Sequence, residues 1–296
     1  MKIEEVAKLE PVERFLYWIK ERHRIYKKRQ AGKSRPWTDD EVLQSIFFTN
    51  PYRENDKTTV WFRENVRDDL SGASTVLMAT VIFRWFNKIE TGEVLADRGL
   101  LTKWNEKQAV RALQRLHLKG PVFTGAYMIK AGNGPKGCKI PNVCQAISNV
   151  WAQRKRLVQV CLDDCRLQAL CEELQKFPHL GGFMSYEIAC DLRYTYLLED
   201  ASDVDTWCNP GPGAKRGLTR LSGESLVFNS SGALVPPAFY DTQARVRQLL
   251  KVARRRLRGM PHFELREVEH SLCEWDKYER ARLKNGRIKR IYKGIL

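Results

Sequence analysis

A chain of 296 residues is long enough to bury one sizeable hydrophobic core or two small ones. Hydrophobic residues make up 43% of it and charged residues 29%, proportions that argue against an intrinsically disordered protein. The 51 Lys and Arg residues exceed the 35 Asp and Glu residues, and the formal net charge of +16 favours a polyanionic partner. Nucleic acid is the first candidate for this partner, and an anionic membrane surface is the second.

No stretch of the sequence suits a membrane. The longest apolar run, residues 76–83, contains Thr80 and is followed by Arg84, so it is far shorter than the ~20 residues of a spanning helix. Residues 1–5 contain no apolar signal region. We therefore expect a soluble, cytoplasmic protein without a membrane partner.

The eight cysteines raise the question of metal sites and disulfides. No Cys-x-x-Cys pair occurs, and the five histidines do not complete a zinc pattern. Because free cysteine behaves as a small hydrophobic residue, we interpret these side chains as reduced, mostly buried thiols. Neither a metal nor another cofactor is expected.

Helical patterns dominate from the N-terminus onward. Pro11 suits the first position of a helix, and apolar residues follow it at helical spacing. Thr38 and Glu41 match a capping box, in which Thr38 accepts from the amide of Glu41, so a second helix is predicted toward Phe48. Residues 74–86 predict a buried helix that is apolar on nearly all sides.

The second half of the chain continues this pattern. Residues 106–118 predict an amphipathic helix, closed by Gly120 and Pro121. Residues 127–141 are rich in Gly and Lys and indicate a loop or a short hairpin. One long helix is predicted from about residue 146 to 176, and two helices rich in Arg and Glu close the chain. Since strand patterns are short and few, the expected fold class is mainly α.

A candidate DNA-binding hairpin lies at residues 177–189, between two predicted helices. It contains Gly181 and Gly182 directly before the second helix. Glycines at such a place let the backbone approach DNA, so that amides at the start of the second helix hold a phosphate. This contact would position the duplex without reading its sequence. An ordinary interhelical turn is the alternative.

An acidic motif follows this hairpin. Residues 203–207 read Asp-Val-Asp-Thr-Trp, and residues 216–221 read Arg-Gly-Leu-Thr-Arg-Leu. This order resembles the helix-hairpin-helix DNA glycosylases, in which Val-Asp-Thr and a helix ending in Arg-Leu follow the hairpin at similar distances. The resemblance implies that Asp205 is the essential carboxylate facing a flipped nucleotide, and that Asp203 is a less favoured candidate. A helix N-cap is the alternative for Asp205, which could also serve as both.

The resemblance implies a mainly α, helix-hairpin-helix DNA glycosylase-like architecture. We expect one compact unit with two lobes. Residues 1–120 would form an N-terminal helical region, and residues 121–296 would carry the hairpin, the catalytic Asp and the closing helices.

The stretch before Arg216 departs from the glycosylases. Residues 207–215 read Trp-Cys-Asn-Pro-Gly-Pro-Gly-Ala-Lys, a rigid loop rich in amides that leads into two cations, Lys215 and Arg216. Such a loop suits a phosphate or a pyrophosphate, bound by the backbone at Gly211 and Gly213. A purely structural turn is the alternative. An enzyme that excises a neutral base does not need a phosphate site here.

Longer motifs occur along most of the chain. They are Phe-Leu-Tyr-Trp-Ile-Lys-Glu-Arg at 15–22, Arg-Pro-Trp-Thr-Asp-Asp at 35–40, Asn-Pro-Tyr-Arg-Glu-Asn-Asp at 50–56, Thr-Gly-Ala-Tyr-Met-Ile at 124–129, residues 205–218, and Glu-Trp-Asp-Lys-Tyr-Glu-Arg at 274–280. With these motifs, roughly residues 10–285 resemble a bacteriophage thymine-hypermodification family, the alpha-glutamyl/putrescinyl thymine pyrophosphorylases. The helical domain of that family also occurs fused to hydroxymethyluracil DNA kinases.

Some members of this family are understood as amino acid:DNA transferases. The resemblance implies that the chain transfers an amino acid or a polyamine onto the 5-methylene of pyrophosphorylated 5-hydroxymethyluracil in double-stranded DNA, displacing pyrophosphate. It places the protein in the cytoplasm of an infected bacterium, with other phage modification enzymes as further partners. A glycosylase-like base-excision enzyme and a non-catalytic DNA-binding module are the alternatives.

The implied site has several parts. Lys215 and Arg216, with Arg53, would bind the pyrophosphate and stabilise its charge as it leaves. Asp205 would deprotonate the attacking amine or stabilise a cationic methylene intermediate.

Glu54 and Asp56, beside Arg53, would hold the amino acid; a surface salt-bridge network is the alternative. A core position is the alternative for any one of the candidate aromatic residues. The other candidates are Gly181, Gly182, Asn50, Gly211 and Gly213 for DNA or phosphate, Trp37, Tyr52, Tyr127 and Trp207 for the base, and Asp276, Tyr278 and Arg280 for closing the site.

An ATP site is not expected. A P-loop requires Gly-x-x-x-x-Gly-Lys-Ser/Thr. The nearest match, Gly-Asn-Gly-Pro-Lys-Gly-Cys-Lys at residues 132–139, has its Lys displaced by one position, lacks the hydroxyl and follows no apolar strand. We therefore expect a helical module without a phosphorylating domain of its own.

Overall fold

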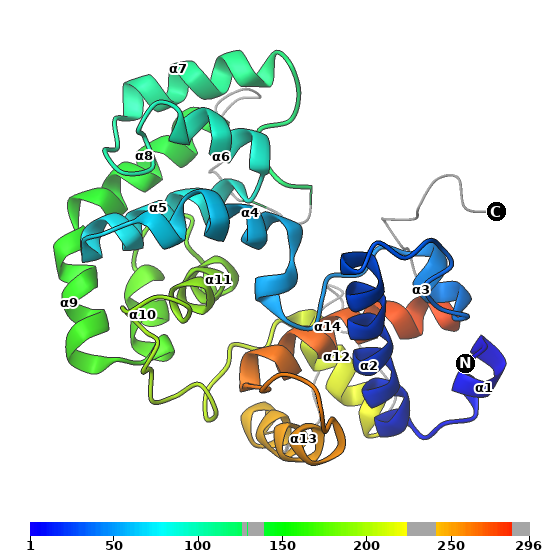
Figure 1. The fold of residues 1–296 in the computed structure, drawn as a ribbon. Coiled ribbons are helices and arrows are strands. Elements are labelled where there is room, and N and C mark those ends of the chain that lie inside the picture. The colour runs from blue at the N-terminus through cyan, green and yellow to red at the C-terminus, as the bar shows by residue number, and fades with distance from the viewer. Residues whose placement is uncertain (126–128, 130–138, 224–240, 286–296) are drawn as a thin grey trace. The chain divides into compact units, whose positions relative to one another are not determined.

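The computed structural model describes residues 1–125, 129, 139–223 and 241–285 (Figure 1). These residues form helices joined by turns, with no β-strand among them, so the mainly α fold class is confirmed. The chain divides into two compact units, of which unit 1 combines Met1–Asp56 with Asp205–Leu296 and unit 2 is Lys57–Val204. The boundary expected at residue 120 lies inside unit 2.

Unit 1 is organised around its last helix, α14, which packs against α2, α3, α12 and α13. Trp275 of α14 and Phe15 of α2 are fully buried, with their ring centroids 5.7 Å apart in an edge-to-face arrangement. The elements of unit 1 are α1 (Ile3–Ala7), α2 (Pro11–Gln30), α3 (Glu41–Ser45), the 3₁₀ turn η1 (Arg53–Asn55), α12 (Pro212–Leu221), α13 (Thr242–Arg256) and α14 (Leu265–Arg282).

Unit 2 is organised around α5, which packs against α6, α8, α9 and α11. Every side chain of α5 from Val76 to Phe86 is buried, because its neighbours cover it on all sides. The elements of unit 2 are α4 (Lys57–Asn65), the 3₁₀ turn η2 (Arg67–Asp69), α5 (Ala73–Phe86), α6 (Ile89–Ala96), α7 (Glu106–His117), α8 (Lys139–Ala152), α9 (Arg154–Asp164), α10 (Leu167–Leu174) and α11 (Gly182–Leu192).

Helices with a strong local pattern occur where they were predicted. Pro11 begins α2, residues 74–86 fall within α5, and residues 106–117 form α7. The two closing helices rich in Arg and Glu are α13 and α14. The predicted loop at 127–141 lies mostly outside the described residues, and α8 begins at Lys139.

The single long helix predicted from residue 146 to 176 is wrong. Three helices, α8, α9 and α10, occupy this stretch. Cys165 ends α9 in a left-handed conformation with a φ of 45°. The carboxylate of Asp203 then accepts the amides of Leu167 (2.8 Å) and Gln168 (2.9 Å) and so caps the start of α10. This cap comes from a distant part of the chain, so the local pattern does not reveal it.

The predicted capping box at Thr38 is also wrong, although a helix does begin nearby. The N-cap of α3 is Asp40, whose Oδ1 accepts the amides of Val42 (3.0 Å) and Leu43 (3.1 Å). Thr38 accepts the amide of Asp40 instead, at 3.2 Å. The helix ends at Ser45, short of Phe48.

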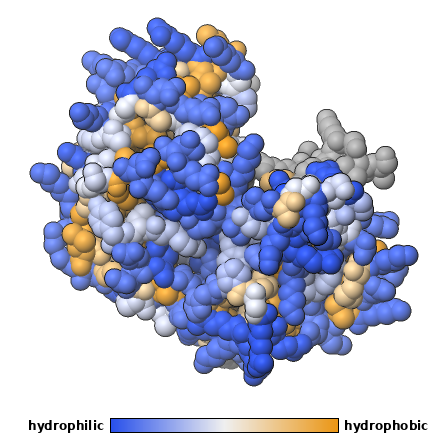
Figure 2. All heavy atoms as spheres, viewed as in Figure 1, coloured by the Kyte–Doolittle hydropathy of each residue, from blue (hydrophilic) through white to orange (hydrophobic). Residues whose placement is uncertain are grey.

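The described residues can be searched for a membrane-spanning helix, for disulfides and for a metal site. In the described parts of the chain no helix is both long and apolar enough to cross a membrane. The face in Figure 2 is mostly hydrophilic, with apolar residues in small separate groups. Seven of the cysteines are described, all as free thiols; Cys165 is half-buried, Cys273 is exposed and the other five are buried. The described residues contain no group of His, Cys, Asp and Glu suited to a metal.

Candidate phosphate and nucleic-acid site

Three arginines of unit 1 converge on one buried carboxylate, that of Asp276 in α14. Arg216 donates from Nε to Oδ2 at 2.9 Å, Arg220 from Nε to Oδ1 at 2.9 Å, and Arg280 from Nε to Oδ2 at 3.2 Å. The Asp276 side chain is fully buried, while the three arginine side chains are 13–26% exposed. We call these four residues the arginine cluster. Three cations thus surround one anion, and all three are partly open to solvent.

The outer atoms of two of these arginines are available. Besides Asp276, neither Arg216 nor Arg220 makes an ion pair or a side-chain hydrogen bond with another residue that the structure describes. Each donates to Asp276 through Nε, so the N–H groups on its two Nη atoms are left for another acceptor. Fixed guanidinium forks of this kind match the oxygens of a phosphate.

The cluster depends on the close packing of α12 against α14. A Cβ built on Gly217 would lie 2.5 Å from the carbonyl oxygen of Leu272, and one built on Gly213 would lie 2.4 Å from Sγ of Cys273. These two glycines, four residues apart, therefore let the helix backbones approach each other. Arg216 and Arg220, also four residues apart on α12, consequently reach Asp276.

Replacing Gly217 with alanine is expected to destabilise the protein by about 1–3 kcal/mol, because the new methyl group meets a backbone oxygen that cannot rotate away. Helix propensity alone would predict the opposite sign, with alanine more favourable by about 1 kcal/mol. Denaturant unfolding followed by circular dichroism measures the change. Gly211→Ala is the control, since a Cβ at that position meets nothing within 4 Å. A Gly217→Ala protein more stable than wild type would contradict the packing role.

The phosphate-binding role expected for Gly211 and Gly213 gives way to a different one. Gly211 is the N-cap of α12, and its amide donates to Oε1 of Glu269 at 3.2 Å. A carboxylate thus already occupies this amide, and Gly213 is buried against Cys273. The Pro-Gly-Pro-Gly stretch starts and packs a helix. Lys215 lies half-buried on α12 and makes no side-chain bond to a described residue.

Asp205 lies in unit 1 and forms a two-point ion pair with Arg254 of α13. The Arg254 Nη2 to Oδ1 distance is 2.6 Å and the Nη1 to Oδ2 distance is 2.8 Å. Arg254 is itself fixed by the carbonyl oxygen of Phe263 (2.7 Å) and by Nε2 of His262 (2.7 Å). The Asp205 side chain is 41% exposed, so its oxygens remain accessible. The carboxylate that caps a helix is that of Asp203, which accepts amides at the start of α10, where Arg166 is the N-cap residue.

The Asn50–Asp56 segment forms a tight, mostly buried turn. Asp56 Oδ1 accepts the backbone amide of Asn50 at 2.9 Å and its side-chain amide at 3.1 Å. Burial raises the pKa of the Asp56 carboxyl, and the nearby charges of Arg266, Arg53 and Arg22 oppose this rise.

The roles predicted for Arg53, Glu54 and Asp56 stay predictions. Arg53 is only 3% exposed, so its side chain lies in the core. Glu54 is half-buried. The side-chain oxygen of Asn50 is buried without a hydrogen-bond partner among the described residues.

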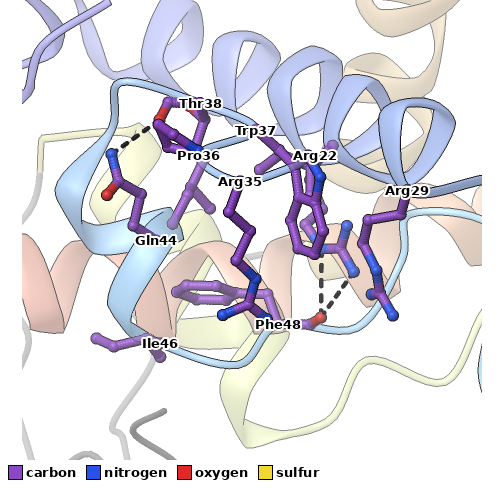
Figure 3. A pocket seen from close by; sticks show the side chains of 11 residues that line it. Arg22, Arg29, Arg35, Pro36, Trp37, Thr38, Gln44, Ile46 and Phe48 are labelled. Atoms are coloured by element: carbon purple, nitrogen blue, oxygen red, sulfur yellow. Dashed lines mark hydrogen bonds between the residues drawn. The ribbon is translucent and has the colours of Figure 1, made fainter. Parts of the chain in front are cut away.

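The candidate aromatic residues fall into different environments. Tyr278 is fully buried and donates to Oδ2 of Asp40 at 2.6 Å, so it belongs to the core rather than to a closing segment. Tyr52 is buried and donates to the carbonyl oxygen of Pro261 at 2.7 Å. Trp207 is half-buried, and Tyr127 lies outside the described residues. Trp37 lines a pocket between α2 and α3 (Figure 3).

The candidate hairpin of unit 2 joins α10 to α11, which pack against each other. Gly181 is the N-cap of α11, is exposed, and has an extended backbone that any residue can adopt. A Cβ there would meet nothing within 4 Å, so the fold itself does not require this glycine. The left-handed residue of the turn is His179, with a φ of 67°. Gly182 begins the helix, and Phe183 beside it is 53% exposed.

Two members of these sites were missed by sequence reasoning. Arg220 completes the arginine cluster, and its spacing of four from Arg216, parallel to that of Gly213 and Gly217, was the available signal. Arg254 lies 49 residues from Asp205, and no local pattern links the two.

Comparison with known protein families identifies the family of this chain. The sequence model of the family described as "5-hmdU DNA kinase, helical domain" matches residues 10–287. The chain belongs to this family of helical domains. One curated relative, the 5-hmdU DNA kinase of Bacillus phage SP10, is 26% identical over 287 residues. The aligned region covers 89% of this chain and 44% of that kinase, so the chain spans less than half of its length. No solved structure matches.

Proposed function

We propose that the chain is a phage DNA-hypermodification enzyme that attaches an amino acid or a polyamine to the 5-methylene of pyrophosphorylated 5-hydroxymethyluracil in DNA. The observation that carries this proposal is the arginine cluster. Its guanidinium groups, positioned by Asp276, suit a leaving group with several negative charges. A base-excision enzyme releases a neutral base and gains nothing from such a cluster.

In the proposed reaction, the nitrogen of a free amine forms a bond to the 5-methylene carbon. The bond between that carbon and the pyrophosphate oxygen breaks, and its electron pair leaves with the pyrophosphate. The amine loses one proton, to Asp205 or to water. Arg216 and Arg220 stabilise the departing charge, with Lys215 on the same helix as a further cation.

Asp205 suits the proton-accepting role because Arg254 holds it in one orientation. The two hydrogen bonds to Arg254 use one acceptor position on each carboxylate oxygen, and a carboxylate offers about four. The remaining positions are open to solvent at 41% exposure and can accept from an amine. Asp205 can also stabilise a cationic methylene intermediate by its charge.

The DNA would be held in the manner of a helix-hairpin-helix protein. The backbone amides at the start of α11, near Gly181 and Gly182, would bind a backbone phosphate. That Gly181 is not required for internal packing favours close approach by an outside partner. The modified base would leave the stack so that its 5-substituent reaches the protein.

A second function is favoured by the family itself. The relative in phage SP10 is a kinase acting on 5-hmdU DNA, and this chain corresponds to less than half of it. A helical module that only holds hydroxymethyluracil DNA for a separate phosphorylating protein would need the basic surface but neither Asp205 nor the arginine cluster.

Nucleoside mass spectrometry separates these functions. Duplex DNA carrying pyrophosphorylated 5-hydroxymethyluracil is incubated with the protein and with each of the twenty amino acids or common polyamines. We expect an adduct nucleoside and stoichiometric pyrophosphate. Abasic sites would identify a glycosylase, and unchanged DNA with every amine would reject the transferase.

Variants test the role of the cluster in the same assay. Arg216→Gln and Arg220→Gln are each expected to lower the rate by about 10²-fold or more, since each removes one charge-stabilising donor. Arg256→Gln is the matched control, because Arg256 pairs with Glu13 on the surface with 50% of its side chain exposed. If all three variants keep the wild-type rate, the cluster does not bind the leaving group.

A further inference from the structure

Helix α2 borders a strongly basic groove on one side. The groove is lined by Lys20, His23, Arg24, Lys27, Lys28, Lys33 and Arg258, together with Ala31, Gly259 and Met260, and no acidic side chain lines it. Lys20, Lys27, Lys33 and Arg258 make no ion pair or side-chain hydrogen bond with another described residue. Uncompensated cations at this density repel one another, so a polyanion that neutralises them binds favourably.

The positive charges around the groove also affect the protonation of His23. The pKa of His23 lies below its usual value, because burial disfavours the charged ring and because the Lys27 and Arg22 cations repel its proton. His23 is therefore uncharged at neutral pH. The attraction of the groove for an anion comes from the lysines and arginines.

The opposite side of α2 faces a different cavity. Arg22, Ile25 and Arg29 of α2 line a pocket with residues 35–38 and with α3 and the segment after it (Figure 3). Ile25, Leu43, Ile46 and Phe48 form an apolar lining, and each of them is less than 9% exposed. A pocket with an apolar lining and a few polar groups at fixed positions is typical of a site for a small organic group.

The polar groups of this pocket suit a flat, hydrogen-bonding ring. The guanidinium carbons of Arg35 and Arg29 lie 4.7 and 5.4 Å from the centre of the Trp37 ring, so three planar groups lie close together. Nucleobases stack on such indole and guanidinium planes. Gln44 donates to the carbonyl oxygen of Thr38 at 2.8 Å, and its own oxygen has no partner among the described residues. That oxygen can accept the N3–H of a uracil or thymine ring.

The groove and the pocket share a wall. Lys28 of the groove donates from Nζ to the carbonyl oxygen of Trp37 at 2.6 Å. The indole Nε1 of Trp37 donates to the carbonyl oxygen of Lys33 at 2.6 Å. Lys28 and Lys33 line the groove, and Trp37 lines the pocket. The segment from residue 28 to 37 therefore borders both, so one ligand can contact lysines of the groove and planar groups of the pocket.

We propose that this groove and pocket form a nucleotide-binding site for one strand of DNA, with phosphates along the lysines and an extrahelical thymine-type base in the pocket. This assignment rests on the proposed function only in taking DNA as the substrate. It names the surface of unit 1 that holds the strand and the cavity that receives the base.

The phosphate part of the site is tested by the salt dependence of binding, measured by fluorescence anisotropy with a labelled duplex. Lys20→Gln/Lys27→Gln is expected to lower the slope of log K against log salt by about 2, and to weaken binding about tenfold or more near 0.1 M salt. Lys103→Gln/Lys107→Gln is the control, because it removes the same charge from two exposed lysines of unit 2. Equal slopes for the two double variants would overturn the groove assignment.

The base part is tested with a duplex in which one thymine stands opposite an abasic site, compared with the fully paired duplex. Wild type is expected to prefer the unpaired thymine, since extruding it costs less. Trp37→Leu should abolish this preference and keep the salt slope. Trp151→Leu, which removes another tryptophan flanked by an arginine (4.8 Å), should change neither.

Further outcomes test the pocket assignment, the strand assignment and DNA binding separately. A Trp37→Leu protein that keeps the preference would overturn the pocket assignment. If thymidine monophosphate displaces the DNA as well as unlabelled strand does at equal nucleotide concentration, the site binds free nucleotides and the strand assignment is wrong. Failure of amine transfer would leave these binding results intact, whereas absence of any DNA binding would reject both proposals together.

Discussion

Replacing Asp191 with alanine is expected to lower the free energy of unfolding by about 3–5 kcal/mol, because the change leaves a buried arginine without its counter-charge. Nε of Arg84 in α5 and Oδ2 of Asp191 in α11 lie 2.5 Å apart, and both side chains are 2% exposed. Asn87 (2.9 Å) and Thr59 (3.4 Å) also accept from Arg84, but neither of these side chains carries a charge. Denaturant unfolding followed by circular dichroism measures the loss.

Two further variants separate this charge effect from general damage. Glu64→Ala breaks the surface ion pair between Arg63 (27% exposed) and Glu64 (59% exposed). It should lower the free energy of unfolding by only about 0–1 kcal/mol. Arg84→Met/Asp191→Leu removes both charges and should recover most of the stability lost in the single variant. A double variant as unstable as Asp191→Ala would show that the cavity, rather than the unpaired charge, dominates.

Asp205→Asn is expected to lower the rate of amine transfer by about 10²–10⁴-fold, because the amide can neither take a proton nor stabilise a cation by charge. Its effect on stability should stay below about 1 kcal/mol, since the pair with Arg254 is 41% and 32% exposed. The rate is measured as pyrophosphate release, and the stability as the denaturation midpoint. A non-catalytic DNA-binding module would tolerate this change in every assay.

Asp203→Ala is the matched control for this experiment. Asp203 lies two residues away but caps α10, so its loss should destabilise the protein by about 0.5–2 kcal/mol and leave the transfer rate unchanged. If Asp203→Ala instead abolished transfer and Asp205→Asn did not, the roles inferred for these two carboxylates would be reversed.

The sequence predicted those helices whose signals are local. The apolar spacing of α2, α5 and α7 and the proline at the start of α2 lie within the helices themselves. The predictions failed where the deciding group came from elsewhere. Cys165 ends α9 in a left-handed conformation, and the capping carboxylate of α10 is Asp203, 35 or more residues away. Periodicity alone cannot detect such a long-range cap.

In the candidate site, too, single residues could be selected from the sequence, but their long-range contacts could not. Arg216 was selected as a phosphate-binding residue, and Asp276 and Arg280 were selected as residues that close the site. No sequence pattern indicated that one carboxylate joins them. Asp276 lies 60 residues from Arg216, so only the packing of α12 on α14 brings them together. Arg53, selected for the pyrophosphate, lies in the core, and its charge alone could not indicate this burial.

The division of unit 1 into two chain segments has a consequence for synthesis on the ribosome. Phe15 packs against Trp275, and Asp40 accepts a hydrogen bond from Tyr278 over a separation of 238 residues. The N-terminal helices must therefore wait for the last helix before their apolar faces are covered, whereas unit 2 is continuous in sequence and can fold as soon as it emerges. The carboxylate of Asp276 arrives with α14, so the ion pairs of the arginine cluster form only after unit 2 has been synthesised.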